Sequence, residues 1–389
     1  MFGLPRAVWL LGWVSLATDA ATESVYPLLP FFLTSVLGAG AVSLGVIEGA
    51  AEAVNSLLKV LSGRRADKSR AQRPLVLLGY SVSSAAKPLM ALVTLPIQAF
   101  VVRILDRLGK GVRSSPRDAM LASWATSETR GRVYGVHQAM DNLGAVIGPV
   151  LATLFLLGYP GRYRTLFALT IIPGAISVLL IFLIPERDDT APVRLKADTT
   201  DTVVSGFSRT DCLPPQFARF MIILTIFSLG NSTDAFLLLR LTNAAGSAKF
   251  VPLMWAGIHV VKAAVSFVGG GWSDRIGRRA VISIGWIVYA IVYAGFAMST
   301  TLTALLSWFL VYGFYFGFAE GTEKALVADL APASRRGTAF GVYNAIVGLG
   351  ALLASIVFGL LWTWFGVTVA FGTGAVLAFV ATALLFVAL

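Results

Sequence analysis

The chain has 389 residues, of which 57% are hydrophobic and 13% charged, and its mean hydropathy is +0.78. Soluble domains carry about 25% charged residues, and a single core could not bury this much apolar sequence, so a water-soluble globular protein is excluded. The net charge of +11 does not indicate a nucleic-acid-binding protein, because the basic residues lie mostly in short segments between apolar runs, where membrane topology places them.

Twelve apolar stretches follow one another along the chain, each close to the roughly 20 residues that a helix needs to cross a bilayer. The first begins with Ala7–Ala17 and is interpreted as an uncleaved helix rather than a signal peptide, because another apolar segment follows Glu23. The pattern predicts an all-α membrane protein. The expected spans are 7–36, 40–62, 74–94, 97–122, 131–157, 164–184, 217–239, 250–271, 280–298, 301–328, 338–361 and 365–388.

A polar segment divides these spans into two sets of six. Residues 185–216 are rich in Thr, Asp and Pro, which predicts a cytoplasmic linker between an N-terminal bundle at 1–184 and a C-terminal bundle at 217–389. An even number of spans places both termini on one side, and the connections on that side hold most of the lysines and arginines between spans. We therefore expect cytoplasmic termini in a plasma membrane, which is the inner membrane if the source is bacterial.

Charged residues recur inside the predicted spans, where each costs roughly 2.5–3.5 kcal/mol at the bilayer centre. Their spacing places them on single helix faces: Glu48 and Glu52 are one turn apart, and so are His137 and Asp141. Such faces predict a water-filled cavity, pairing between the charges, or both. The predicted cavity residues are Tyr26, Glu48, Glu52, Arg103, Asp106, Arg107, Lys110, His137, Asp141, Glu320, Tyr343 and Asn344.

The two halves also repeat each other, since Gly131, Gly135 and Gly144 recur as glycines 206 residues later. The segment Gly-Gly-Trp-Ser-Asp-Arg-Ile-Gly-Arg-Arg at 270–279, and a partial copy at 63–70, resemble the loop signature of the major facilitator superfamily. The resemblance covers essentially the whole chain. It implies two pseudo-symmetric six-helix bundles, secondary transport by alternating access, and gating by Gly63, Asp67, Lys68, Gly270, Asp274, Arg275, Gly277 and Arg278. The arginines among these are also consistent with simple topology anchors.

Two further patterns refine the resemblance. Gly135, Gly144, Gly148 and Pro149 on the fifth span fit part of a motif that the family's proton antiporters carry, which implies export; close helix packing with a proline kink is the alternative interpretation. The segment from Asp106 to Ala119 on the fourth span resembles a group of prokaryotic members.

Asp19, Glu23 and Asp234 are the predicted proton-coupling residues. Desolvation favours the protonated form of a carboxylate, and the first two lie where the resemblance implies proton coupling. Arg103 lies where the family's helix-four arginine falls, and movement away from a carboxylate would trigger protonation. A static lattice of salt bridges that fixes helix packing is the competing hypothesis.

The sequence thus predicts a proton-coupled exporter of a small molecule, and the alternatives are uptake of an organic anion or, less favoured, a non-transporting sensor. We expect a monomer in the lipid bilayer, driven by a proton gradient without a cofactor. No nucleotide-binding loop, nucleophile elbow or metalloprotease helix is present in the sequence, so an enzyme is not expected. His137 and His259 do not make a metal site, and no nucleic-acid partner is expected.

Overall fold

The computed structural model describes residues 4–68, 72–124, 130–185, 214–331 and 336–388, and all regular structure in these ranges is helical. The predicted linker lies almost entirely outside them. The first span is broken after α1 (Arg6–Val25) into a turn of 3-10 helix, α2 (Leu29–Phe31) and a π-helical turn at Phe32–Val36. Pro27 and Pro30 lie in this broken part. Proline has no backbone N–H to donate within a helix, which accounts for the break.

The other helices of the first half follow the predicted spans within a few residues. They are α3 (Ala41–Lys68), α4 (Gln72–Leu89), α5 (Pro96–Ser123), α6 (Arg130–Gly158), and the pair α7 (Tyr163–Leu169) and α8 (Ile171–Phe182), which together make the sixth span.

In the second half, α9 (Pro215–Gly230) and α10 (Ala235–Ala245) form one interrupted span. The remaining helices are α11 (Val251–Ile276), α12 (Arg278–Met298), α13 (Leu302–Leu330), α14 (Arg336–Phe365) and α15 (Val367–Ala388). Together the two halves contain the twelve spans that the sequence predicts. Nine stretches in the described ranges are long and apolar enough to cross a membrane by composition alone, and α5 is absent from that set because of its many charges.

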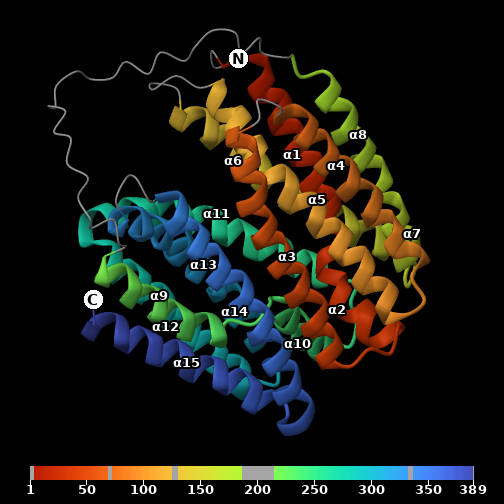
Figure 1. Cartoon of the computed structure of the whole chain (residues 1–389). Helices are drawn as coiled ribbons and strands as arrows, with labels where there is room; N and C mark the ends of the chain where they lie inside the picture. Colours follow the sequence, from red (N-terminus) through yellow and green to blue (C-terminus); the bar gives the residue numbers. More distant parts are fainter. Residues whose placement is uncertain (1–3, 69–71, 125–129, 186–213, 332–335, 389) are drawn as a thin grey trace, which may run out of the picture.

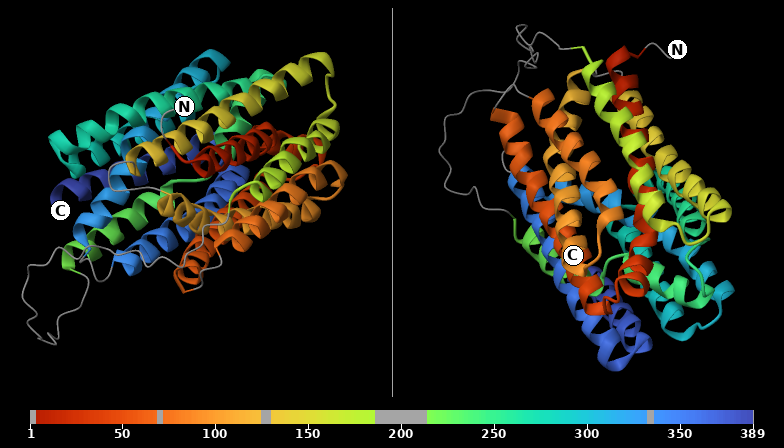
Figure 2. Two further views of the ribbon diagram at one scale, coloured as in Figure 1. Left: turned by 90° about the horizontal axis from the view of Figure 1, so that it is seen from above. Right: turned by 90° about the vertical axis from the view of Figure 1, so that its right-hand side faces the viewer.

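Each half packs mainly within itself. In the first half α1 lies against α6 and α5 against α3 and α4; in the second half α12 lies against α13 and α15. The halves meet where α3 packs along α14 and α6 along α11. They lie together around α2 and α10 and diverge toward the N- and C-termini (Figure 1), and Figure 2 gives two further views of this arrangement.

The contact between the halves is tightest at the end away from the termini, where small residues let α3 and α14 approach closely. A Cβ atom built on Gly45 would lie 2.2 Å from the backbone oxygen of Ser355, and one on Gly359 would lie 2.7 Å from that of Ala41. Phe236 and Trp362 pack in the same region, with ring centroids 5.9 Å apart. The structure is therefore closed on the side opposite the termini.

Substituting Gly45 by Ala should push this closed side apart, because the new methyl group overlaps backbone rather than a flexible side chain. We expect spin labels at Gln72 and Arg279, at the open ends of the two halves, to move closer in Gly45→Ala as the protein shifts to the opposite conformation. Gly372→Ala is the matched control, since nothing lies within 4 Å of its added Cβ. An unchanged distance distribution in double electron–electron resonance would contradict the prediction.

Candidate substrate cavity and coupling residues

A cavity of about 630 Å³ separates the two halves on the side of the termini. Its walls come from α6, α11 and α13, and Arg278 at the start of α12 lies at its rim. Ligand pockets measure about 300–1,000 Å³, so the cavity has room for a small organic molecule. The polar lining residues are Gln138, Asn142, His259, Lys262, Arg278, Glu320, Thr322 and Lys324.

Lys262 is the central cation of this cavity. Its ammonium nitrogen lies 3.4 Å from the ring centroid of Phe316 and 5.2 Å from that of Trp255, and it makes no ion pair in the described part of the chain. The other cations on the lining have carboxylate partners. Lys324 donates to Glu320 at 3.0 Å, and Arg278 lies 3.3 Å from Asp329.

Glu23 connects the two halves. Its Oε2 accepts a hydrogen bond from Trp255 Nε1 at 2.7 Å and lies 4.0 Å from His259 Nε2. Trp255 is 3% exposed and packs against Tyr26, with ring centroids 5.1 Å apart and the ring planes tilted by 51°. Because α1 and α11 belong to different halves, this carboxylate is tied to the contact that closes the side away from the termini.

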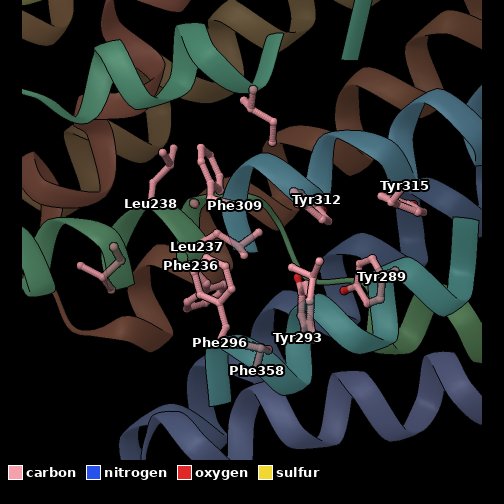
Figure 3. Close-up of a cluster of buried hydrophobic side chains, with 14 of the residues drawn as sticks. Phe236, Leu237, Leu238, Tyr289, Tyr293, Phe296, Phe309, Tyr312, Tyr315 and Phe358 are labelled. Carbon is pink, nitrogen blue, oxygen red and sulfur yellow. The ribbon is translucent and has the colours of Figure 1, made fainter. Parts of the chain in front are cut away.

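Asp234 lies at the break between α9 and α10. Residues 231–234 are not helical, so their backbone groups and side chains need other partners inside the membrane. Tyrosine hydroxyls from α12 and α13 contact this break: Tyr312 donates to Asp234 at 2.9 Å, Tyr289 donates to the Gly230 carbonyl at 2.9 Å, and Tyr293 and Tyr315 contact Ser232 and Asn231. Figure 3 shows these four tyrosines beside the apolar side chains of α10.

Four charged side chains form a buried network between α3, α4 and α5. Arg103 Nε donates to Glu48 at 2.8 Å, a second nitrogen of Arg103 donates to the same carboxylate at 2.5 Å, and Arg103 also lies 3.4 Å from Asp106. Lys87 lies 3.4 Å from Asp106, which accepts from Ser83 as well. All four charged side chains are at most 6% exposed. Glu48, Arg103 and Asp106 were predicted as cavity residues; in the structure they are buried in this network with Lys87, and none of them lines the cavity between the halves.

Asp141 belongs to a separate cluster near the open side. It accepts a hydrogen bond from Ser15 of α1, and Arg117 of α5 contacts Ser15 at 3.4 Å. His137, one turn earlier on α6, is buried, and its Nε2 has no hydrogen-bond partner in the described residues. The two residues therefore lie between helices rather than on the cavity wall.

The remaining predicted residues have mixed surroundings. Glu52 accepts from Asn55 at 3.0 Å, and the Arg107 Nε is buried without a partner in the described part of the chain. Glu320 lines the cavity, whereas Tyr343 is buried and donates to Glu323 at 3.0 Å. Asp19, Lys110 and Asn344 are half-buried.

Six of the eight predicted gating residues lie outside the residues whose surroundings the structure describes: Gly63, Asp67, Lys68, Gly270, Asp274 and Arg275. Gly135 of the helix-five pattern lies outside them as well. Gly277 has a positive φ of 90° between α11 and α12, a conformation that favours glycine. On α6, Gly144 and Gly148 face α1 so closely that added Cβ atoms would lie 2.4 and 2.3 Å from backbone oxygens. The contacts of these two glycines are consistent with the packing interpretation.

Several cavity residues were not among the predicted ones. Gln138 and Asn142 line the cavity, whereas the predicted face of α6 was marked by His137 and Asp141, one position earlier and about 100° away on the helix. Lys262 could be selected from the sequence alone, because any charged residue within a membrane span is a candidate functional residue. The sequence could not show that its neighbours on the lining are ion-paired while it is not.

Comparison with known proteins identifies the family. The model described as Major Facilitator Superfamily matches residues 9–258 and 220–389. The chain belongs to the major facilitator superfamily. It is thus a multi-pass membrane protein and a secondary transporter of a small molecule, and the predictions of the fold and of a transporter rather than an enzyme are confirmed.

Sequence relatives of this MFS chain align with most of its length. It is 32% identical to an uncharacterised MFS-type transporter from Methanocaldococcus jannaschii over 92% of this chain and 89% of that protein. It is 25% identical to the multidrug resistance protein MdtH of Edwardsiella ictaluri over 85% and 80% of the two chains. A POT family transporter crystallised with 5-aminolevulinic acid shares the fold with a TM-score of 0.81 at 13% identity, covering 100% of this chain and 96% of the other.

Proposed function

We propose that this MFS transporter exchanges protons for a small molecule and exports that molecule from the cytoplasm. The hydrogen bond from Trp255 to Glu23 carries the proposal, since it joins an intramembrane carboxylate of one half to a donor in the other. Any conformational change that opens the closed side must separate the halves there. Proton binding at Glu23 and alternating access are then linked.

Proton binding at Glu23 is linked to the conformational change because a charged carboxylate without a hydrogen-bond donor is costly inside a membrane. With the halves together, the hydrogen bond from the Trp255 indole stabilises ionised Glu23. When the halves part on that side, the carboxylate loses its donor within the membrane, and binding a proton from the outside removes the charge. Return to the observed conformation restores the donor and releases the proton on the side of the termini.

This order of events suits antiport. A substrate in the cavity would be carried outward while Glu23 is ionised, and protonation outside would precede the return. Asp234 and Asp19 are proposed as further proton-binding groups in the same path. The likeness to MdtH, whose name denotes multidrug resistance, supports export. Uptake of an organic anion by the helix-four cations has less support, because Arg103 is held by Glu48 and Asp106.

The moving units are proposed to be residues 1–184 and 217–389, joined by a linker at 185–216, in a monomer with both termini in the cytoplasm. The paired loop signatures, with Asp67 and Asp274, are proposed to close the cytoplasmic side in the opposite conformation. The helix-four pattern from Asp106 to Ala119 is proposed to mark a prokaryotic subgroup of the family, and an inner-membrane location follows for a bacterial source.

A vesicle assay tests the proposed function. Proteoliposomes carrying a pH-sensitive dye and an imposed pH gradient would receive pools of small molecules. We expect at least one pool to dissipate the gradient faster with the protein than in protein-free vesicles. If compounds move across the membrane with no accompanying proton movement, transport stands but proton coupling is wrong.

A further inference from the structure

One cation on the cavity lining makes no direct ion pair in the described part of the chain. Glu320 balances Lys324, and Asp329 balances Arg278. His259 is 4.0 Å from Glu23. Lys262 differs from the other lining lysines and arginines because aromatic rings, and no described carboxylate within 4.0 Å, lie beside its ammonium group. The carboxylates of Asp234, Glu320 and Glu23 act on this charge from farther away. Lys262 is therefore the described lining cation that has no direct ion pair.

The rings of Phe316 and Trp255 hold the Lys262 ammonium group in place but do not accept its hydrogen bonds. A cation over an aromatic face gains about 0.5–2 kcal/mol, but an ammonium group also has three hydrogen-bond donors, and ring faces are weak acceptors. No described residue accepts a hydrogen bond from Lys262. Phe316 and Trp255 thus hold the ammonium at the cavity wall with donors available for a ligand.

The neighbouring wall, formed by α6, offers neutral hydrogen-bonding groups. Gln138 and Asn142 of α6 line the cavity, and their side-chain amides form no hydrogen bonds within the described part of the chain. Ala263, Gly317 and Ala325 supply small apolar surface between the polar groups. A ligand that fits this lining has an anionic group for Lys262, a compact apolar body, and a polar group for the α6 amides.

We propose that the transported molecule is a compact amphipathic organic anion whose carboxylate or equivalent acidic group binds Lys262. This inference rests on the proposed function for the cavity and adds the class of substrate. It transfers anion recognition from the helix-four cations to α11 in the second half. A neutral analogue of the same shape forfeits the charge-assisted hydrogen bond, which is stronger than a neutral one.

Binding of a matched pair of probes tests the proposal. Indole-3-propionate and indole-3-propanol differ mainly in charge, and their affinities for the purified full-length protein would be measured by isothermal titration calorimetry in nanodiscs without a pH gradient. We expect the acid to bind at least about tenfold more tightly than the alcohol. Equal affinities, or no binding of the acid in the millimolar range, would overturn the proposal.

Variants assign the preference to one side chain. Lys262→Gln should abolish the difference between acid and alcohol, and Lys262→Arg should retain most of it. Lys249→Gln is the matched control, because Lys249 also lies over a phenylalanine ring, 5.0 Å from the Phe250 centroid, but outside the cavity. A preference that survives in folded Lys262→Gln would refute the assignment, and Lys262→Arg decides the matter if the Gln variant does not fold.

The two proposals fail in different ways. Probe binding at equilibrium needs no proton movement, so a missing proton flux in the vesicle assay leaves the anion preference standing. Conversely, a proton-coupled flux of neutral compounds alone would support the proposed function while contradicting the anionic substrate.

Discussion

Replacing Glu23 by Gln is expected to abolish proton-driven accumulation of substrate while exchange of substrate across the membrane continues. Glutamine keeps the shape of the side chain and can still accept a hydrogen bond from Trp255, but it cannot bind or release a proton. A gradient of one pH unit stores about 1.4 kcal/mol and supports roughly a tenfold concentration ratio for one-to-one exchange. The ratio should fall to about one in Glu23→Gln.

The measurement uses whichever compound moves protons in the vesicle screen. Uphill accumulation and counterflow are recorded in the same proteoliposomes, because counterflow needs only the conformational cycle. Trp255→Phe removes the donor to Glu23 but keeps an aromatic ring against Tyr26, so coupling should weaken. Trp308→Phe is the control, since that indole donates to Ser299 outside the site. Full accumulation in Glu23→Gln would assign coupling to Asp19, Asp234 or another group.

Replacing Arg103 by Met is expected to destabilise the protein by about 3–5 kcal/mol. Glu48 and Asp106 are buried and share this guanidinium, so removing it leaves carboxylates without adequate neutralisation. Changing Glu48 to Met in the same chain removes one of the stranded charges. The double variant should therefore be destabilised by less than the sum of the two single variants.

Thermal or denaturant unfolding in detergent measures these differences. Lys324→Met breaks the pair of Lys324 with Glu320, which is half exposed to the cavity, and should cost no more than about 1 kcal/mol. Additive effects of Arg103→Met and Glu48→Met would mean that the two side chains do not depend on each other.

The spans and the charged helix faces could be predicted from the sequence because both depend on local spacing. Glu48, Arg103 and Asp106 recur at helical intervals, and their meeting in one network follows from the cost of isolated charges in a membrane. The breaks in the first and seventh spans were less predictable. Asp234 shows the reason: its break depends on four tyrosines from helices far along the chain.

The cavity wall depends on helix rotation, which spacing alone leaves uncertain by one position. Gln138 rather than His137 faces the cavity, although the two are neighbours in sequence. Tyr343 was expected in the cavity, but its hydroxyl points to Glu323, a buried carboxylate that also accepts from Trp286 at 2.8 Å. These pairings cross between helices, so only the packed structure reveals them.

Infrared difference spectroscopy tests most directly whether protonation of Glu23 follows the conformational change. The spectra would compare the wild-type protein with Gly45→Ala, which favours opening of the side away from the termini. The account predicts that Gly45→Ala gains a band of a protonated carboxylic acid, and that this band is missing when Glu23→Gln is added. If Gly45→Ala opens that side and no such band appears, Glu23 is not the group that couples protons to transport.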